Sequence, residues 1–343
     1  MRVLVTGGTG FIGAHTVKAL NDAGHSVRLL VRSPKRIEES LHPLGVTIDD
    51  YVVGDMRDEQ IVGRALDGCD AVFHAAAEVS VERRRGAEVL ASNPRGTEVV
   101  IDAAIAQGCD PIIHVSSVAA LWQPGVPLIH ANLPPATSEA AYGQSKSLAE
   151  EHVRRRQAEG APIVITYPAA VWGPPAGAAL GESIRALEPY ARYGVMLSAG
   201  ALSVIDVRDL ALIHAAALQP GRGPRRYMCG GHFVRMPEYA RVLREVTGRR
   251  FPIVPMPGGG LRALGYAVDA AMHVVPIDSV FTHEGMNLLT LWVPTDDRGI
   301  REDLGINLRD LHETIRDALL GLVSVGRLEP KHAGTALAHL PTP

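Results

Sequence analysis

Near its start the chain passes from an apolar run into a glycine-rich turn and then into a helical pattern. The apolar run, 2–6, indicates a strand, and residues 11–23 have helical periodicity. Gly7 permits a tight turn, Gly10 lets the backbone approach a pyrophosphate, and Gly13 lets the helix pack closely on the strand. The helix N-terminus offers unpaired N–H groups to phosphates. We therefore predict a dinucleotide-binding turn, with a glycine turn without a ligand as the alternative, and cofactor contacts from Gly7, Thr9, Gly10, Phe11, Ile12 and Gly13.

Strand and helix patterns alternate through the first half of the chain. Strands are predicted at 2–6, 26–31, 48–53, 71–75, 111–116 and 162–167, and helices at 11–23, 59–66, 97–107 and 140–156. Strands separated by helices form right-handed βαβ units. The pattern therefore predicts an α/β protein with a Rossmann-type doubly wound parallel sheet.

The pattern changes after Tyr167, and stretches rich in glycine and proline interrupt it from Gly173 onward. We predict that 1–172 and about 201–230 form an NADP-binding Rossmann domain. A smaller, mostly helical substrate lobe is expected at about 173–200 and 231–325, with helices near 236–247, 260–272, 282–290 and 308–322. The polar residues 326–343 indicate a loose tail.

Composition excludes several classes of function. The 343 residues carry 34 Lys+Arg and 37 Asp+Glu, a formal net charge of −3, which gives no reason to expect nucleic acid as a partner. No apolar run reaches the roughly 18 residues of a membrane-spanning helix, and the start lacks a signal-peptide pattern, so we expect a cytoplasmic protein. Three scattered cysteines and 14 histidines without an HExxH pair predict no metal site.

The end of the second predicted strand lacks the acidic residue that commonly binds the ribose 2′-hydroxyl of NAD. Arg32 stands there, followed by Ser33, Lys35 and Arg36. A planar guanidinium suits a 2′-phosphate, which favours NADP(H), although a solvated basic loop would have the same sequence. NAD(H) remains the alternative cofactor.

The third and fourth predicted strands end in residues that could meet the rest of the cofactor. Asp55, with Met56 beside it, could approach the adenine, or it could form a turn. His74 is expected to be packed, and small side chains would let a flat cofactor pass close to the backbone at Ala75 and Ala76.

Tyr142 and Lys146 are four residues apart in a predicted helix, so their side chains share one face. A free phenol has a pKa near ~10. A nearby ammonium group favours the phenolate by about 4 kcal/mol at ~4 Å and an effective dielectric of ~20, before desolvation is subtracted. Such a tyrosine can donate a proton to an oxyanion or take one from a hydroxyl. Chance occurrence of this spacing is the alternative.

Ser116 and Ser117 end the fifth predicted strand, at the edge where open α/β sheets bind ligands. Adjacent side chains point to opposite sides of an extended chain, so we expect one hydroxyl to reach a substrate oxygen. A strand-end cap is the alternative for either serine. The run Arg154-Arg155-Arg156 indicates a solvated helix face.

Several segments occur in the order of a known family. They are TGGTGFIG at 6–13, the serine pair, YGQSK at 142–146 followed by Glu150, NPRGT at 93–97, YPAAVWGP at 167–174 and VIDVRD at 204–209. Together they resemble the extended branch of the short-chain dehydrogenase/reductase superfamily, which includes the NAD-dependent epimerases and dehydratases. The segment REDLG at 301–305 is similar to dihydroflavonol reductase-like and 3β-hydroxysteroid dehydrogenase-like members.

The resemblance implies roles for individual residues. Tyr142 would be the general acid/base, Lys146 would lower its pKa and hold the nicotinamide ribose, and Ser117 would orient the substrate oxygen. Asn93 would help to hold the active-site helix. The resemblance also implies cofactor contacts from Ser116, Tyr142, Lys146, Pro168 and Val171.

Two departures from the family pattern bear on the substrate. Tyr167 replaces an arginine and Trp172 replaces a tyrosine, and both changes favour a more apolar substrate than a sugar nucleotide. We expect an NADP(H)-dependent oxidoreductase that acts on a ketone or secondary alcohol of a moderately hydrophobic small molecule. The alternatives are a nucleotide-sugar epimerase or dehydratase with tightly bound NAD, for which Arg185, Arg192 and Arg208 would supply a diphosphate cleft, and a non-catalytic NADP(H)-sensing protein. Relatives often pair through helices beside the sheet, which leaves a homodimer open.

Overall fold

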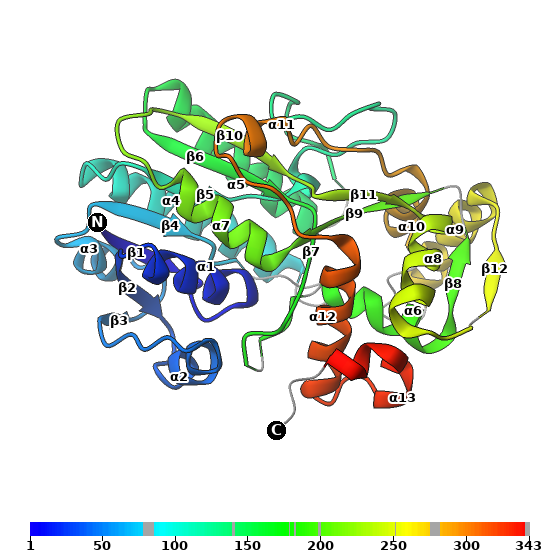
Figure 1. Ribbon diagram of the computed structural model, residues 1–343. Helices are drawn as coiled ribbons and strands as arrows, with labels where there is room; N and C mark the ends of the chain where they lie inside the picture. The colour runs from blue at the N-terminus through cyan, green and yellow to red at the C-terminus, as the bar shows by residue number, and fades with distance from the viewer. Residues whose placement is uncertain are drawn as a thin grey trace.

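A computed structural model describes residues 1–77, 86–138, 141–177, 179–181, 183–197, 200–250, 252–274 and 282–339. Its main feature is a seven-stranded parallel sheet in the order β10-β6-β5-β4-β1-β2-β3 (Figure 1). The strands are β1 (Arg2–Thr6), β2 (Ser26–Val31), β3 (Tyr51–Val53), β4 (Ala71–His74), β5 (Ile112–Val115), β6 (Ile163–Pro168) and β10 (Arg225–Cys229). Because the strand order reverses between β1 and β4, a ligand crevice is expected at their carboxyl ends. The predicted doubly wound fold is confirmed.

Helices cover both faces of this sheet because its central strands are apolar on both sides. Val3 and Val5 of β1 face one core and Leu4 faces the other, and all three are fully buried. The first face carries α1 (Phe11–Asp22), α2 (Lys35–Leu41), α7 (Val207–Ala217) and α11 (Arg298–Glu302). The second carries α3 (Glu59–Leu66), α4 (Gly86–Ala106) and α5 (Ala141–Ala158).

A second part of the molecule has its own core around Trp172 and Tyr239. Its three-stranded sheet, in the order β11-β9-β7, is built from β7 (Ala170–Trp172), β9 (Ala201–Asp206) and β11 (His232–Arg235). A parallel pair joins β8 (Val195–Leu197) to β12 (Ile253–Pro255). The helices are α6 (Leu187–Tyr193), α8 (Met236–Thr247), α9 (Gly258–Val274), α10 (His283–Leu291) and α12 (Leu311–Ser324).

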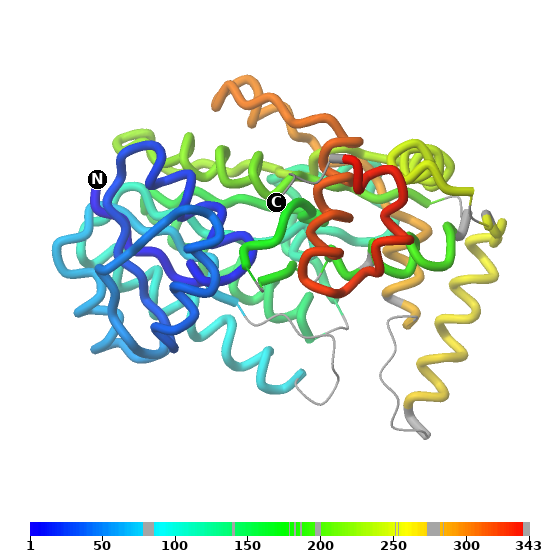
Figure 2. The backbone as a smooth tube through the Cα atoms, turned by 60° about the horizontal axis from the view of Figure 1, so that its bottom comes forward, coloured from blue at the N-terminus to red at the C-terminus, as the bar shows by residue number. Residues whose placement is uncertain are grey.

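The structure differs from the sequence-based prediction in several places. The third strand begins at Tyr51 rather than 48, and α4 begins at Gly86 rather than 97. The prediction of a loose tail from 326 is wrong for the described residues. They form α13 (Pro330–Ala333) and a 3₁₀ helix (Gly334–His339), which fold back beside α12 (Figure 2). The physical reason is that Leu328, Ala333 and Ala336 are buried in the core of the second part.

Candidate active site

The glycine turn after β1 brings three backbone segments into contact. Gly7 has φ +76°, and a Cβ placed on it would lie 2.6 Å from the backbone nitrogen of Ala76. A Cβ on Gly13 would lie 2.1 Å from the carbonyl oxygen of Gly7. No side chain caps the N-terminus of α1, whose N-cap residue is Gly10. The turn is therefore a cradle without side chains at a helix N-terminus, which fits the pyrophosphate of a dinucleotide.

The cradle opens into a cleft of about 1260 Å³ along the carboxyl ends of the parallel strands. Every residue that the sequence assigned to the cofactor contributes to its lining. They are Gly7, Thr9, Gly10, Phe11, Ile12, Gly13, Arg32, Asp55, Met56, Ala75, Ala76, Ser116, Tyr142, Lys146, Pro168 and Val171. The structure thus gathers these residues at one site, and their individual roles remain predictions.

The loop after β2 presents basic residues to one end of the cleft. Arg32 is exposed and lines the cleft together with Ser33 and Arg36. The ammonium group of Lys35 instead lies 3.4 Å from a carboxylate oxygen of Glu39. The predicted basic site therefore consists of two arginines and a serine hydroxyl, without the lysine.

Asp55 forms the turn that was one of its two predicted roles. Its Oδ1 accepts hydrogen bonds from the backbone nitrogen and Nε of Arg57, both at 2.9 Å. These contacts, opposed by partial burial, lower the pKa of Asp55 to about 2. Met56 packs against Gly96 of α4. The carboxylate still lines the cleft, but two of its bonds serve the local turn.

The tyrosine, the lysine and one serine meet at the middle of the cleft. Ser117 follows β5, and its Oγ accepts a hydrogen bond from the backbone nitrogen of Ala119 at 3.1 Å. Tyr142 lies in the first turn of α5 and is hydrogen-bonded to Ser117. The Nζ of Lys146, one turn further on, donates to the carbonyl oxygen of Val115 at 3.4 Å. All three side chains line the cleft.

The electrostatics of this trio differ from the prediction. Burial raises the pKa of Tyr142, and the hydrogen bond with Ser117 only opposes this shift. Burial also lowers the pKa of Lys146 to about 8. Lys146 Nζ lies 6.0 Å from the centre of the tyrosine ring. The expected lowering of the tyrosine pKa is therefore wrong for this structure, because desolvation of the buried phenol is the largest cause of its shift.

Asn93 and Ser116 are close to the trio but face away from its reactive atoms. Asn93 is buried in α4, outside the lining of the cleft, and donates to Ser145 Oγ at 3.2 Å. Ser145 Oγ in turn donates to the carbonyl oxygen of Tyr142 at 2.8 Å. Asn93 is thus hydrogen-bonded to α5, and the role that the resemblance implied for it stays a prediction. Ser116 lines the cleft as Ser117 does, but its hydroxyl donates to Glu150 at 2.7 Å, whereas the Ser117 hydroxyl is hydrogen-bonded to Tyr142.

The far end of the cleft is largely apolar. Leu202 of β9, Leu288 and Leu289 of α10, and Trp292 line it, together with the cationic side chain of Arg185. Trp292 Nε1 donates to Ser203 Oγ at 2.9 Å, which fixes the plane of the indole.

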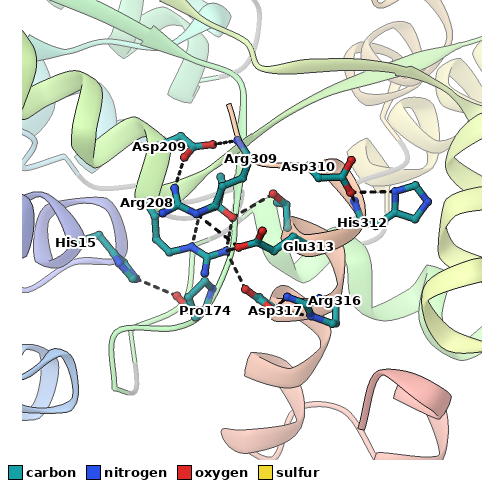
Figure 3. Close-up of polar contacts among 12 residues, drawn as sticks. His15, Pro174, Arg208, Asp209, Arg309, Asp310, His312, Glu313, Arg316 and Asp317 are labelled. Atoms are coloured by element: carbon teal, nitrogen blue, oxygen red, sulfur yellow. Dashed lines mark hydrogen bonds and ion pairs between the residues drawn. The ribbon is translucent and has the colours of Figure 1, made fainter. Parts of the chain in front are cut away.

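The three arginines proposed for a diphosphate cleft do not come together. Only Arg185 lines the cavity. Arg192 pairs with Glu188 at 3.1 Å. Arg208 lies at the junction of α7 and α12, where its guanidinium contacts Asp206 at 2.7 Å and Asp317 at 2.8 Å (Figure 3).

Sequence analysis missed a buried ionic group behind the trio. Glu150, fully buried, accepts hydrogen bonds from Arg154 Nε at 2.6 Å and from the Tyr167 hydroxyl. Arg154 therefore does not belong to a solvated helix face. Two signals pointed to it: Lys146, Glu150 and Arg154 are spaced by four residues on one face of α5, and Tyr167 stands where the family has an arginine.

Neither a metal centre nor a membrane-spanning helix is found in the described part of the chain. Those residues contain no group of three or more His, Cys, Asp or Glu side chains arranged to hold a metal ion. Within the same ranges, no helix is long and apolar enough to cross a membrane.

Comparisons with known proteins agree with this geometry. The family model described as NAD dependent epimerase/dehydratase family matches residues 3–230. A putative dihydroflavonol 4-reductase from Synechocystis sp. is 33% identical over 263 residues, covering 72% of this chain and 73% of that protein. The 4-hydroxy-2-methyl-3-oxo-4-farnesyl-3,4-dihydroquinoline-1-oxide ketoreductase of Stigmatella aurantiaca is 29% identical over 326 residues, covering 93% of this chain and 96% of that one.

A solved structure, that of gox2253, is similar over 95% of this chain and 99% of its own, with a TM-score of 0.78 and 26% identity. The family match spans more than half of the chain and includes the glycine turn, Ser117, Tyr142 and Lys146. The chain therefore belongs to the NAD dependent epimerase/dehydratase family of extended short-chain dehydrogenases/reductases, and it is an NAD(P)-dependent oxidoreductase.

Proposed function

We propose that the chain is an NADP(H)-dependent enzyme that interconverts a ketone and a secondary alcohol on a moderately hydrophobic small molecule. The observation that carries this proposal is the shared cleft. Ser117, Tyr142 and Lys146 line the same cavity as the glycine cradle, and its far end is apolar. Two relatives named as reductases, one of them a ketoreductase, support a carbonyl as the reacting group.

The cofactor would be held by backbone at one end and by arginine at the other. A Cβ at Gly7 or Gly13 would collide with backbone atoms, so this turn presents backbone rather than side chains to a pyrophosphate. Arg32 and Arg36 would bind a 2′-phosphate through charge-assisted hydrogen bonds. When bound, NADP(H) supplies or accepts a hydride at its nicotinamide ring.

Residues of the chain itself donate and accept the proton of this reaction. A phenol with a raised pKa keeps its proton at neutral pH, so Tyr142 can donate to an oxygen that gains negative charge during reduction. The hydroxyl of Ser117 holds the same oxygen and orients it. In the oxidation direction the phenol must first lose its proton, which the ammonium group of Lys146 makes easier.

A nucleotide-sugar epimerase or dehydratase with tightly bound NAD is the second candidate, because the cationic side chains of Arg185 and Arg327 also line the cleft. It requires cofactor that co-purifies with the protein. Absorbance at the reduced-nicotinamide band, recorded on purified protein with and without a sugar nucleotide, separates the two candidates.

The test of the proposed function is Tyr142→Phe, which removes one hydroxyl and leaves the ring. We expect carbonyl reduction to fall by a factor of roughly 10² to 10⁴, the usual contribution of a general acid. Binding of NADPH should be retained, since the cradle is untouched. Tyr193→Phe is the matched control, because that tyrosine is 74% exposed and outside the cleft lining. Turnover by Tyr142→Phe at the wild-type rate would exclude the mechanism.

A further inference from the structure

We propose that Glu150 is a positioning residue for this reaction: it is the buried counter-ion that keeps the ammonium group of Lys146 charged, and Arg154 and Tyr167 hold it in place. The inference rests on the proposed function, because it assigns Glu150 a task only if Lys146 serves the chemistry of Tyr142. Glu150 is outside the lining of the cleft and contacts no reacting atom.

The end of β5 connects the two charged groups, because each is hydrogen-bonded to one of two adjacent residues. Lys146 Nζ donates to the carbonyl oxygen of Val115, and the hydroxyl of Ser116, the next residue, donates to Glu150 Oε2 at 2.7 Å. Lys146 and Glu150 are also one turn apart on the same face of α5. Both are buried, so water cannot screen their attraction as it would at the surface.

A buried carboxylate stays ionised only when its oxygens are well paired. Glu150 Oε1 accepts from Arg154 Nε at 2.6 Å and from the Tyr167 hydroxyl at 2.5 Å. Arg154 is itself fixed, because its Nη1 donates to the carbonyl oxygen of Leu133 at 2.6 Å and its Nη2 to that of Ala131 at 3.0 Å. The charge of the Glu150 carboxylate is therefore compensated by Arg154, and its hydrogen bonds hold the carboxylate in place.

Glu150 is the anion among the described groups that face Lys146. Those groups are Tyr142 and Glu150 on α5, His74 on β4 and His114 on β5. Burial lowers the pKa of His74 to about 3 and that of His114 well below its ordinary value, so both rings are neutral near pH 7. Tyr142 is protonated there as well. Burial lowers the pKa of Lys146 to about 8, and Glu150 is the group that opposes this shift.

The charge of Lys146 can be measured directly in the cofactor-free protein. The chain has four lysines, Lys18, Lys35, Lys146 and Lys331, so 13C-lysine labelling gives a simple NMR spectrum in which each can be assigned by substitution to arginine. In Glu150→Gln, which keeps the shape and removes the charge, we expect the titration midpoint of Lys146 to fall by about one pH unit. The alkaline limb of the pH profile of kcat/KM for carbonyl reduction should move by the same amount.

Glu151→Gln is the matched control, since it makes the same change on the exposed side of the same helix. It should leave both the titration and the pH profile unchanged. If Glu150→Gln fails to fold because Arg154 loses its partner, the double variant Glu150→Gln/Arg154→Met removes both charges and should also titrate Lys146 below the wild-type midpoint.

The outcomes separate this inference from the proposed function. A folded Glu150→Gln protein with the wild-type titration of Lys146 would overturn the inference, even if activity were lower, because a purely structural role would leave that midpoint in place. Survival of turnover in Tyr142→Phe would overturn the proposed function instead.

Discussion

Arg32 is the residue on which cofactor choice should depend. It is exposed at the cleft directly after β2, where the sequence has an arginine in place of the acidic residue that commonly binds a ribose hydroxyl. For Arg32→Ala we expect NADPH binding to weaken by about tenfold or more, the effect of losing a hydrogen bond to a charged group. NADH binding should barely change, and wild-type protein should prefer NADPH. Fluorescence titration with both cofactors measures this.

Lys35→Ala is the control for that experiment, because Lys35 begins α2 close to Arg32 in the chain but pairs with Glu39. It should leave both affinities within about twofold of wild type, since exposed ion pairs contribute little. An equal loss of NADPH and NADH affinity in Arg32→Ala would show that the guanidinium does not bind the 2′-phosphate.

Individual residues also show which features of the site could be predicted from the sequence and which could not. Tyr142, Lys146 and Ser117 could be placed together because helix spacing and strand ends fix where side chains point. The direction of the pKa shift of Tyr142 could not be predicted. It depends on the burial of the phenol and on the 6.0 Å between Lys146 Nζ and the centre of the tyrosine ring, which tertiary packing sets. Arg154 was misread for the same reason: three consecutive arginines look alike in sequence, and only the fold turns one toward Glu150.

At the level of elements, α4 was predicted to begin eleven residues too late. Pro94 lies inside this helix, where it lacks a backbone donor and usually ends or bends a helix. Burial of Val89, Ser92 and Asn93 on the turns before it holds the helix together. Packing against the sheet therefore outweighs the tendency of proline to end a helix, on which a prediction from sequence depends strongly.

The C-terminal 3₁₀ helix should contribute measurably to stability. Ala336 is buried in the second core, and Ala338 on the same element is exposed. We expect Ala336→Asp to lower the free energy of unfolding by about 3 kcal/mol, because it buries a carboxylate without a partner. Ala338→Asp should change it by less than about 0.5 kcal/mol. Urea denaturation of the two variants measures the difference, and equal stabilities would show that this segment does not pack.

On the scale of the whole molecule, the large sheet could be predicted and the small one could not. Alternating strands and helices determine a doubly wound sheet through the handedness of βαβ units. The small sheet is assembled from β7, β9 and β11, of which β7 has three residues and β11 four, and long segments of chain separate the three strands. Ionic contacts between α7 and the start of α12, such as Arg309 to Asp209, join the two parts (Figure 3). Contacts between residues so far apart in the chain produce no local pattern in the sequence.

His214 links several elements of the main core and should make its stability depend on pH. Its ring contacts Thr16 of α1 at 2.9 Å and Thr166 of β6 at 3.2 Å. Burial lowers the pKa of His214 to about 3, whereas the unfolded chain takes up this proton near its ordinary value of 6.5. Between these values the unfolded state binds more protons, so the free energy of unfolding falls as the pH falls.

The change that isolates this effect is His214→Gln, whose amide can still contact both threonines but cannot titrate. Wild-type protein should lose about 2 kcal/mol of stability between pH 7 and pH 5 through His214 alone, since each pH unit below 6.5 costs about 1.4 kcal/mol. His214→Gln should lose that much less over the same interval, whatever its stability at pH 7. His42→Gln, at an exposed position, should keep the wild-type dependence. Urea denaturation at both pH values measures the slopes, and parallel slopes for wild type and His214→Gln would mean that the buried ring does not set the acid limit of the fold.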